Sequence, residues 1–184
     1  MKLVCASFGL EMELLENYVT VLVVENAGYL TEIVSSLKKQ SEGEEGIFVF
    51  AENDKIQKID KKLALVIDPF SISVNERKII NKLYTKLGEI APDYFEDKAK
   101  LTEDAIVLFD KLVLASPFAN LVYDLDYDWM ELFKGFNVRF EETAVTLVEK
   151  LVEYMHILTN LLGIKVLCLV NINCLLYTSD AADD

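Results

Sequence analysis

Four carboxylates gather in the segment LVYDLDYDWMEL. Asp124, Asp126 and Asp128 occupy every second position, and Glu131 follows three residues later. Alternating residues on an extended stretch point to the same side, where carboxylates can converge on a hard cation such as Ca²⁺, which binds oxygen ligands in flexible geometry. The spacing lacks the glycine and the bidentate glutamate of an EF-hand loop. The same residues also suit an acidic turn that caps a short helix beginning at Trp129, so the spacing alone leaves both interpretations open.

Lysines form the second group that could do chemistry. The window from Lys55 to Lys86 contains eight basic and three acidic residues, a charge of 8 − 3 = +5, whereas the whole chain carries −13 and the remainder therefore −18. This segregation predicts a local basic face for an anionic partner. The alternative is an ordinary solvated helix and turn. The candidates for contacts with a nucleic-acid backbone are Lys38, Lys39, Lys55, Lys58, Lys61 and Lys62.

Motifs for catalysis are missing from the sequence. It contains no glycine-rich phosphate loop, no GxSxG and no HExxH. The string LALVID resembles the strand whose final aspartate, here Asp68, holds Mg²⁺ in P-loop ATPases, but no loop accompanies it to bind a triphosphate. The single histidine, His156, lies among apolar residues of a predicted helix. No nucleophile, base and orienting group come together, and the sequence therefore predicts a protein that is not an enzyme.

The first third of the chain alternates short apolar runs with turns. A helix is predicted after Asn26, a suitable N-cap, and it extends to about Lys39. Buried β-branched runs separated by helices are typical of an α/β sheet. The predicted strands are residues 2–8, 19–24 (VTVLVV), 47–50 and 63–67.

The middle of the chain is predicted to be helical. Helices are expected at residues 76–90, from a Thr102 cap to Ser116-Pro117, at 129–133 and, longest of all, at 143–162 before Gly163. A strand at 165–172 then returns to the sheet. The expected organisation is an α/β head in residues 1–70 and 163–173, an inserted α-helical leg in residues 71–162, and a tail in residues 174–184.

Composition gives further bounds. Of the 184 residues 52% are apolar, which suits either a large subunit interface or a generous monomer core. The cysteines Cys5, Cys168 and Cys174 show neither metal-site nor disulfide spacing, which favours a reducing compartment. The N-terminus lacks signal-peptide features, and polar residues interrupt the most apolar stretch, 156–177. We therefore expect a cytoplasmic protein without a membrane span.

Several segments, taken in order, resemble one family. VTVLVVEN before a helix, GIFVFAEN, LALVIDPFSISVNERKIINKLY, LVYDLDYDWMELFKGFNVRFEE and GIKVLCLVNI are similar to the spacer-acquisition accessory protein of type II-A CRISPR systems, the "Csn two" family. The similarity extends over about residues 2–172, and DLDYDWMELFKGFNVRFE is its most specific part.

The resemblance implies a head similar to P-loop ATPases but without their nucleotide motif, joined to a helical leg. It implies a homotetrameric ring whose lysine-lined channel holds double-stranded DNA ends, and Ca²⁺ at the acidic residues Asp124, Asp126, Asp128 and Glu131. It also implies an accessory role in antiviral defence, with the CRISPR adaptation integrase complex and the effector nuclease as partners. A P-loop-like NTPase with Asp68 on Mg²⁺, and an oligomerisation module without a DNA role, are the alternatives.

The last eleven residues, CLLYTSDAADD, match none of these patterns. They resemble translated sequencing-adapter tails, so residues 174–184 are predicted to be non-native. Members of the family continue after KVLCLVNI into a further helix and strand of the head. We therefore expect the sheet of this chain to be incomplete.

Overall fold

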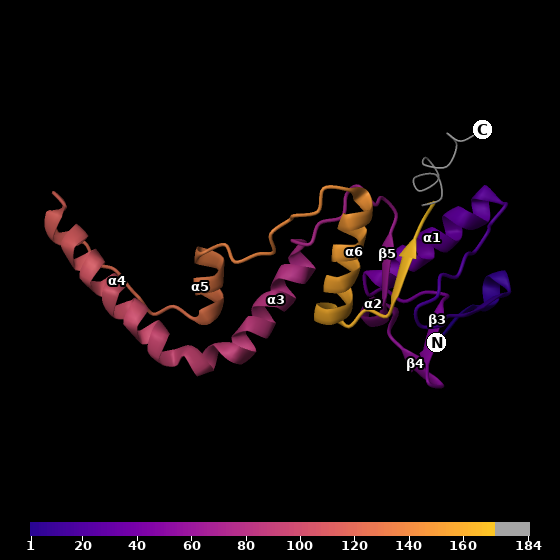
Figure 1. Cartoon of the computed structure of the whole chain (residues 1–184), viewed down its shortest axis with the longest axis horizontal. Coiled ribbons are helices and arrows are strands. Elements are labelled where there is room, and N and C mark those ends of the chain that lie inside the picture. The colour runs from indigo at the N-terminus through magenta and orange to yellow at the C-terminus, as the bar shows by residue number, and fades with distance from the viewer. Residues whose placement is uncertain (172–184) are drawn as a thin grey trace. The chain divides into compact units, whose positions relative to one another are not determined.

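The computed structural model describes residues 1–171, which form two compact units of a mixed α/β protein (Figure 1). Of the described residues, Met1–Val74 and 142–171 form the head unit, and Asn75–Glu141 form the helical unit. Residues 142–162 thus belong to the head unit, whereas the sequence analysis expects them in the leg. Their grouping has a physical reason, because Leu151, Tyr154 and Leu158 bury their side chains there. The predicted non-native tail lies outside the described residues.

An antiparallel sheet forms one half of the head unit. Its strand order is β2–β1–β3–β4, and Leu3 of β1 lies opposite Met12 on one side and Phe50 on the other. Side chains alternate across a strand, and this places Leu3, Cys5 and Phe50 in the core. The strands are β1 (Lys2–Cys5), β2 (Leu10–Glu13), β3 (Val49–Glu52) and β4 (Lys55–Gln57), with a short helical turn, η1 (Ala6–Phe8), between the first two.

A second, parallel sheet contains β5 (Leu63–Val66) and β6 (Val166–Leu169). Two further hydrogen bonds extend this pairing, from Lys165 N to Lys62 O at 2.8 Å and from Val170 N to Val66 O at 3.0 Å. The sequence places both strands correctly within two or three residues. The parallel pair brings the end of the described chain back beside its first third.

Helix α1 (Ala27–Ser41) packs its apolar stripe on both sheets. It begins at Asn26 as predicted, because the Asn26 side chain accepts hydrogen bonds from the N–H groups of Gly28 and Tyr29. Its buried residues Ile33 and Leu37 join a core that also includes α2 (Ile59–Lys62). The fully assembled core consists of Leu3, Cys5, Ile33, Leu37, Phe48, Phe50, Ile59 and Leu63.

Helix α6 (Leu147–Ile157) is shorter than the helix predicted over residues 143–162. It begins later because Thr146 and Glu149 form a reciprocal capping box. Hydrogen bonds from the N–H groups of Thr146 and Val145 lower the pKa of the Glu149 carboxyl group. The helical segment as a whole still ends at Leu162 as predicted, because one π-helical turn, η3 (Leu158–Leu162), follows α6 directly. Gly163 then adopts the left-handed conformation at φ 70°.

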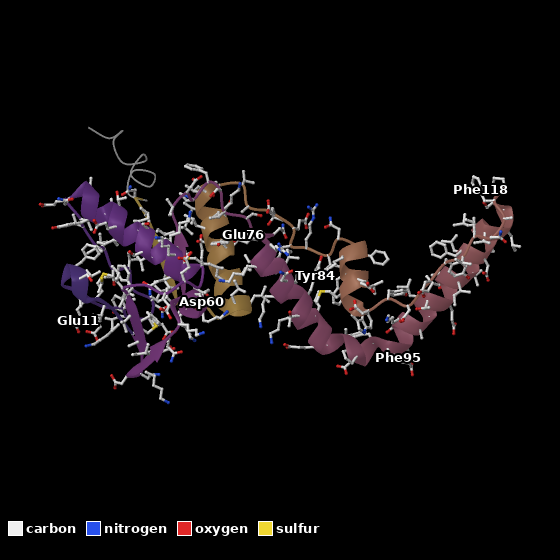
Figure 2. The ribbon with its side chains drawn as sticks, turned by 180° about the vertical axis from the view of Figure 1, so that it is seen from behind. Glu11, Asp60, Glu76, Tyr84, Phe95 and Phe118 are labelled. Atoms are coloured by element: carbon white, nitrogen blue, oxygen red, sulfur yellow. The ribbon has the colours of Figure 1, made fainter. Side chains whose placement is uncertain are left out.

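The helical unit contains α3 (Arg77–Ile90), the turn η2 (Ala91–Tyr94), α4 (Phe95–Ala115) and α5 (Trp129–Gly135). The ring of Tyr84 in α3 packs against Phe133 of α5, with ring centroids 5.7 Å apart (Figure 2). The predicted cap at Thr102 is wrong. α4 begins seven residues earlier, and the Thr102 hydroxyl inside it donates to Lys98 O at 2.9 Å. Pro92 in the first turn of η2 is compatible with this continuation, since a first-turn position needs no N–H donor.

The predicted strand at residues 19–24 is also wrong. The structure places this run outside any helix or strand, with Val19 91% and Val23 79% exposed. Val24 packs against the head core. β-Branched side chains favour a strand only where a neighbouring strand supplies hydrogen bonds, and no neighbour pairs with this run in the described residues.

Candidate functional site

The acidic strip, defined as Asp124, Asp126, Asp128 and Glu131, lies in the helical unit. Residues 121–128 run back along α4, which precedes them (Figure 1). Tyr127 hydrogen-bonds through its hydroxyl to the Thr102 hydroxyl at 2.9 Å, and Tyr123 donates to an Asp110 carboxylate oxygen at 2.6 Å. The alternation predicted from sequence is present, because the tyrosines face α4 while all four carboxylates of the strip are exposed.

Lys98 ties the strip to α4. Its ammonium group lies 4.8 Å from the centroid of the Tyr127 ring and 5.6 Å from that of Trp129, and it donates to Tyr127 O. A cation over two aromatic faces is attracted by both rings. Sequence analysis missed this residue. Lys98 lies between the helices predicted at residues 76–90 and after Thr102, and no sequence pattern marks it.

The carboxylates of the strip form local hydrogen bonds with the backbone. Asp128 accepts from Glu131 N at 2.7 Å, and Glu131 accepts from Asp128 N at 2.9 Å, so that together they form the capping box of α5. Asp124 accepts from Asp126 N at 2.9 Å. In residues 1–171 no three His, Cys, Asp or Glu side chains are arranged to hold a metal ion. In a single chain these hydrogen bonds agree with the capping interpretation, and calcium binding by the strip stays a prediction.

The candidate lysines all lie in the head unit. Lys38 and Lys39 are exposed in the last turn of α1, where their charge also favours the negative end of the helix. Lys55 belongs to β4, and Lys58 precedes the first residue of α2. Both are exposed.

Two of the candidate lysines are partly neutralised. Lys61 lies 3.3 Å from an Asp60 carboxylate oxygen, and Lys62 lies 3.7 Å from one of Glu52. The other four, Lys38, Lys39, Lys55 and Lys58, form no ion pair within the part of the chain that the structure describes. Those four are the stronger candidates for an anionic partner. Asp60 adjoins Lys61 in the sequence, whereas Glu52 reaches Lys62 only through the fold.

A family model described as CRISPR-associated protein (Cas_Csn2) matches residues 40–183 of the chain. The chain belongs to this family. The match includes the whole helical unit, the acidic strip and the lysines Lys55, Lys58, Lys61 and Lys62, whereas Lys38 and Lys39 precede it. It extends into the segment predicted to be non-native. The resemblance drawn from the sequence is confirmed, and this Cas_Csn2 chain is a CRISPR-associated protein.

Other residues considered for chemistry have structural surroundings in this Cas_Csn2 chain. Asp68 lies two residues after the end of β5 and accepts a hydrogen bond from Phe70 N at 3.0 Å, which forms a tight turn. His156 is exposed in the last turn of α6. The thiols of Cys5 and Cys168 are unbridged, and burial raises the pKa of Cys168. No helix among residues 1–171 has both the length and the apolar character needed to cross a membrane.

Replacing Asp128 by alanine is expected to lower the free energy of unfolding by about 1 kcal/mol, because the N-cap of α5 is lost. The matched control is Asp126→Ala, which removes the same charge from the strip but no cap. Urea unfolding of the two variants without calcium measures the difference. Equal stability of the two variants would contradict the capping assignment.

Proposed function

We propose that this Cas_Csn2 chain is a non-enzymatic accessory protein of CRISPR spacer acquisition that binds the ends of double-stranded DNA as a homotetrameric ring. Family membership carries this proposal. The exposed ammonium groups of Lys38, Lys39, Lys55 and Lys58, which form no ion pair within residues 1–171, support it. Duplex DNA is recognised without regard to sequence through contacts between basic side chains and phosphates. The adaptation integrase complex and the effector nuclease are the proposed partners.

The proposal locates the DNA contacts on the head unit and not on the helical unit. Lys38 and Lys39 lie on α1, and Lys55 and Lys58 lie near the strand and helix that precede β5. In contrast, the helical unit presents the exposed carboxylates of the acidic strip, which repel phosphate. A ring that receives a duplex is then expected to turn the lysine-bearing surface inward.

The fold of the head unit is part of the same proposal. We propose an architecture similar to P-loop ATPases without a nucleotide site. A parallel β5–β6 pair with α1 packed on β5 supports it. Asp68 accepts a hydrogen bond from Phe70 N after β5, and the sequence contains no glycine-rich loop that would bind a triphosphate beside it.

Calcium dependence is proposed on the carboxylate spacing and on the family resemblance. Within one chain Asp128 and Glu131 already serve as helix caps, and the strip does not form a closed ligand set. The effect of calcium is therefore measured separately from DNA binding.

End binding is tested with one duplex in two forms, linear and covalently closed. The full chain is expected to shift the linear form in an electrophoretic assay at low salt and to leave the circle nearly unshifted, because a ring can be threaded only from an end. Affinity for the linear form should fall steeply with salt. Equal binding to both forms, or no binding to either with Ca²⁺ present, would refute the proposal. A repeat with a chelator reports the calcium requirement independently.

A further inference from the structure

Helix α4 carries two apolar stripes, and only one of them is covered. On the covered side the Tyr127 hydroxyl lies 2.9 Å from that of Thr102, and the ring of Tyr123 stacks on Phe109 with centroids 5.3 Å apart. Both contacts come from the returning segment 121–128. This segment therefore occupies one face of α4 within the helical unit.

The second stripe follows a heptad repeat and is exposed except at Ala105, which is half-buried. Its residues are separated by four, three, four and three positions, the spacing of a coiled-coil seam. The exposed fractions of Leu101, Leu108 and Leu112 are 39%, 54% and 55%. We call this set the α4 seam, and its members are Leu101, Ala105, Leu108, Leu112 and Ala115.

The seam needs a partner for physical reasons. α4 has 21 residues and none of them is buried, although helices in water gain most of their stability from packing an apolar face. The exposed apolar surface continues beyond the helix end at Phe118, which is 70% exposed at the tip (Figure 2). Contiguous apolar surface of this kind marks an interaction site.

Charges beside the seam identify the partner. In heptad notation Ala105 and Leu112 occupy position a, and Asp104 and Lys111 both occupy position g. In an antiparallel helix pair position g faces position g of the other helix, whereas in a parallel pair it faces position e. Here position e holds Thr102 and Phe109, which are uncharged. Asp104 and Lys111 are exposed and form no ion pair in the described chain.

A second copy of the same helix satisfies both the seam and these charges. If Leu101 of one copy lies opposite Leu112 of the other, then Ala105 lies opposite Leu108, and the arrangement repeats itself about a two-fold axis. The same register brings Asp104 of one copy to Lys111 of the other, twice. Small alanines opposite leucines let the two helices approach closely.

We propose that α4 pairs antiparallel with α4 of a second copy of this chain through the seam, with Asp104 and Lys111 setting direction and register. The pairing rests on the self-assembly included in the proposed function, and it specifies one of the interfaces. A two-fold contact of this kind uses the same surface on both subunits.

Cysteine trapping tests direction and register. Leu101→Cys and Leu112→Cys chains, each with the native cysteines replaced by alanine, are oxidised alone and as a mixture. Only the mixture is expected to form a disulfide-linked dimer, because positions 101 and 112 of one helix are about 16 Å apart and a disulfide spans at most about 7 Å between Cα atoms. A dimer from Leu101→Cys alone would indicate parallel pairing and overturn the proposal, as would no dimer from the mixture.

A charge exchange tests the same interface with the native cysteines retained. Lys111→Asp is expected to weaken self-association about tenfold in sedimentation equilibrium, because two attractions become two repulsions. Asp104→Lys combined with Lys111→Asp should restore it. The matched control, Lys100→Asp, changes the same charge on the outer face of α4 and should leave association unchanged. Self-association that is as strong in Lys111→Asp as in the double variant and the control would refute the seam. A wild-type chain that is monomeric would refute it as well.

DNA binding of the same samples separates this inference from the proposed function. If end binding persists while the exchange leaves assembly unaffected, the seam is wrong and the DNA role stands. If the exchange behaves as expected and the wild-type chain binds no DNA, the seam stands and the DNA role is wrong.

Discussion

Reversing Lys38, Lys39, Lys55 and Lys58 to glutamate together is expected to lower affinity for linear duplex about a hundredfold or more at low salt. Each lysine that contacts a phosphate releases counterions on binding, and each lost contact also reduces the slope of log affinity against log salt by about 0.9. These four are the candidate lysines, out of the six, that the described chain leaves without an ion pair. Fluorescence anisotropy with a labelled duplex at several salt concentrations measures both quantities.

The control for this variant reverses Lys100 and Lys134, which lie in the helical unit. This pair changes charge in the same sense but is expected to leave the salt slope unchanged. Splitting the head variant into a pair on α1 and a pair near α2 tells which group contributes more. A loss of affinity that is the same for the head and control variants would show that net charge, and not location, decides binding.

Lys61 and Lys62 are expected to contribute less than the other four. Their ammonium groups lie within 4 Å of Asp60 and Glu52, at 3.3 and 3.7 Å, and an anion would have to displace a carboxylate. The sequence could not separate the six lysines in this way. Asp60 adjoins Lys61 in the chain, but Glu52 meets Lys62 only because β3 and α2 come together in the head.

Elements that depend on local signals were predicted well. Asn26 caps α1, Asp128 precedes α5, and Gly163 ends the helical segment before β6, all as the sequence indicated. Each signal is a side chain that satisfies a backbone group, or a backbone conformation within a few residues, so no knowledge of distant contacts is needed.

Elements that depend on distant partners were predicted poorly. Residues 19–24 have the composition of a buried strand, but the strands of the described sheets form their hydrogen bonds with one another and not with this run. Thr102 has the composition of a cap, but its hydroxyl bonds to Lys98 O and to Tyr127 from a distant segment. The acidic strip differs from these cases. Its alternation and the cap at Asp128 depend on neighbouring residues and were predicted, whereas calcium binding stays a prediction.

The core of the head unit also contains a polar contact that composition could not reveal. Gln40, at the end of α1, is only 8% exposed, and its side-chain amide pairs with Phe48 in both directions. Its Nε2 donates to Phe48 O and its Oε1 accepts from Phe48 N, each at 2.9 Å. The amide thus takes the place of a neighbouring strand at the entry to β3, next to the buried Phe50.

Replacing Gln40 by methionine is expected to lower the free energy of unfolding by about 2–4 kcal/mol, because both backbone groups of Phe48 lose their partner while the side-chain volume is kept. Chemical denaturation measures this change, and Ser35→Ala on the exposed side of α1 is the control. Gly46→Ala tests the same contact from the other side, since a Cβ there would lie 2.5 Å from the Gln40 side chain. If Gln40→Met unfolds like the wild-type chain, the amide is not what holds α1 to β3, and the position of Lys38 and Lys39 beside the head sheet must have another cause.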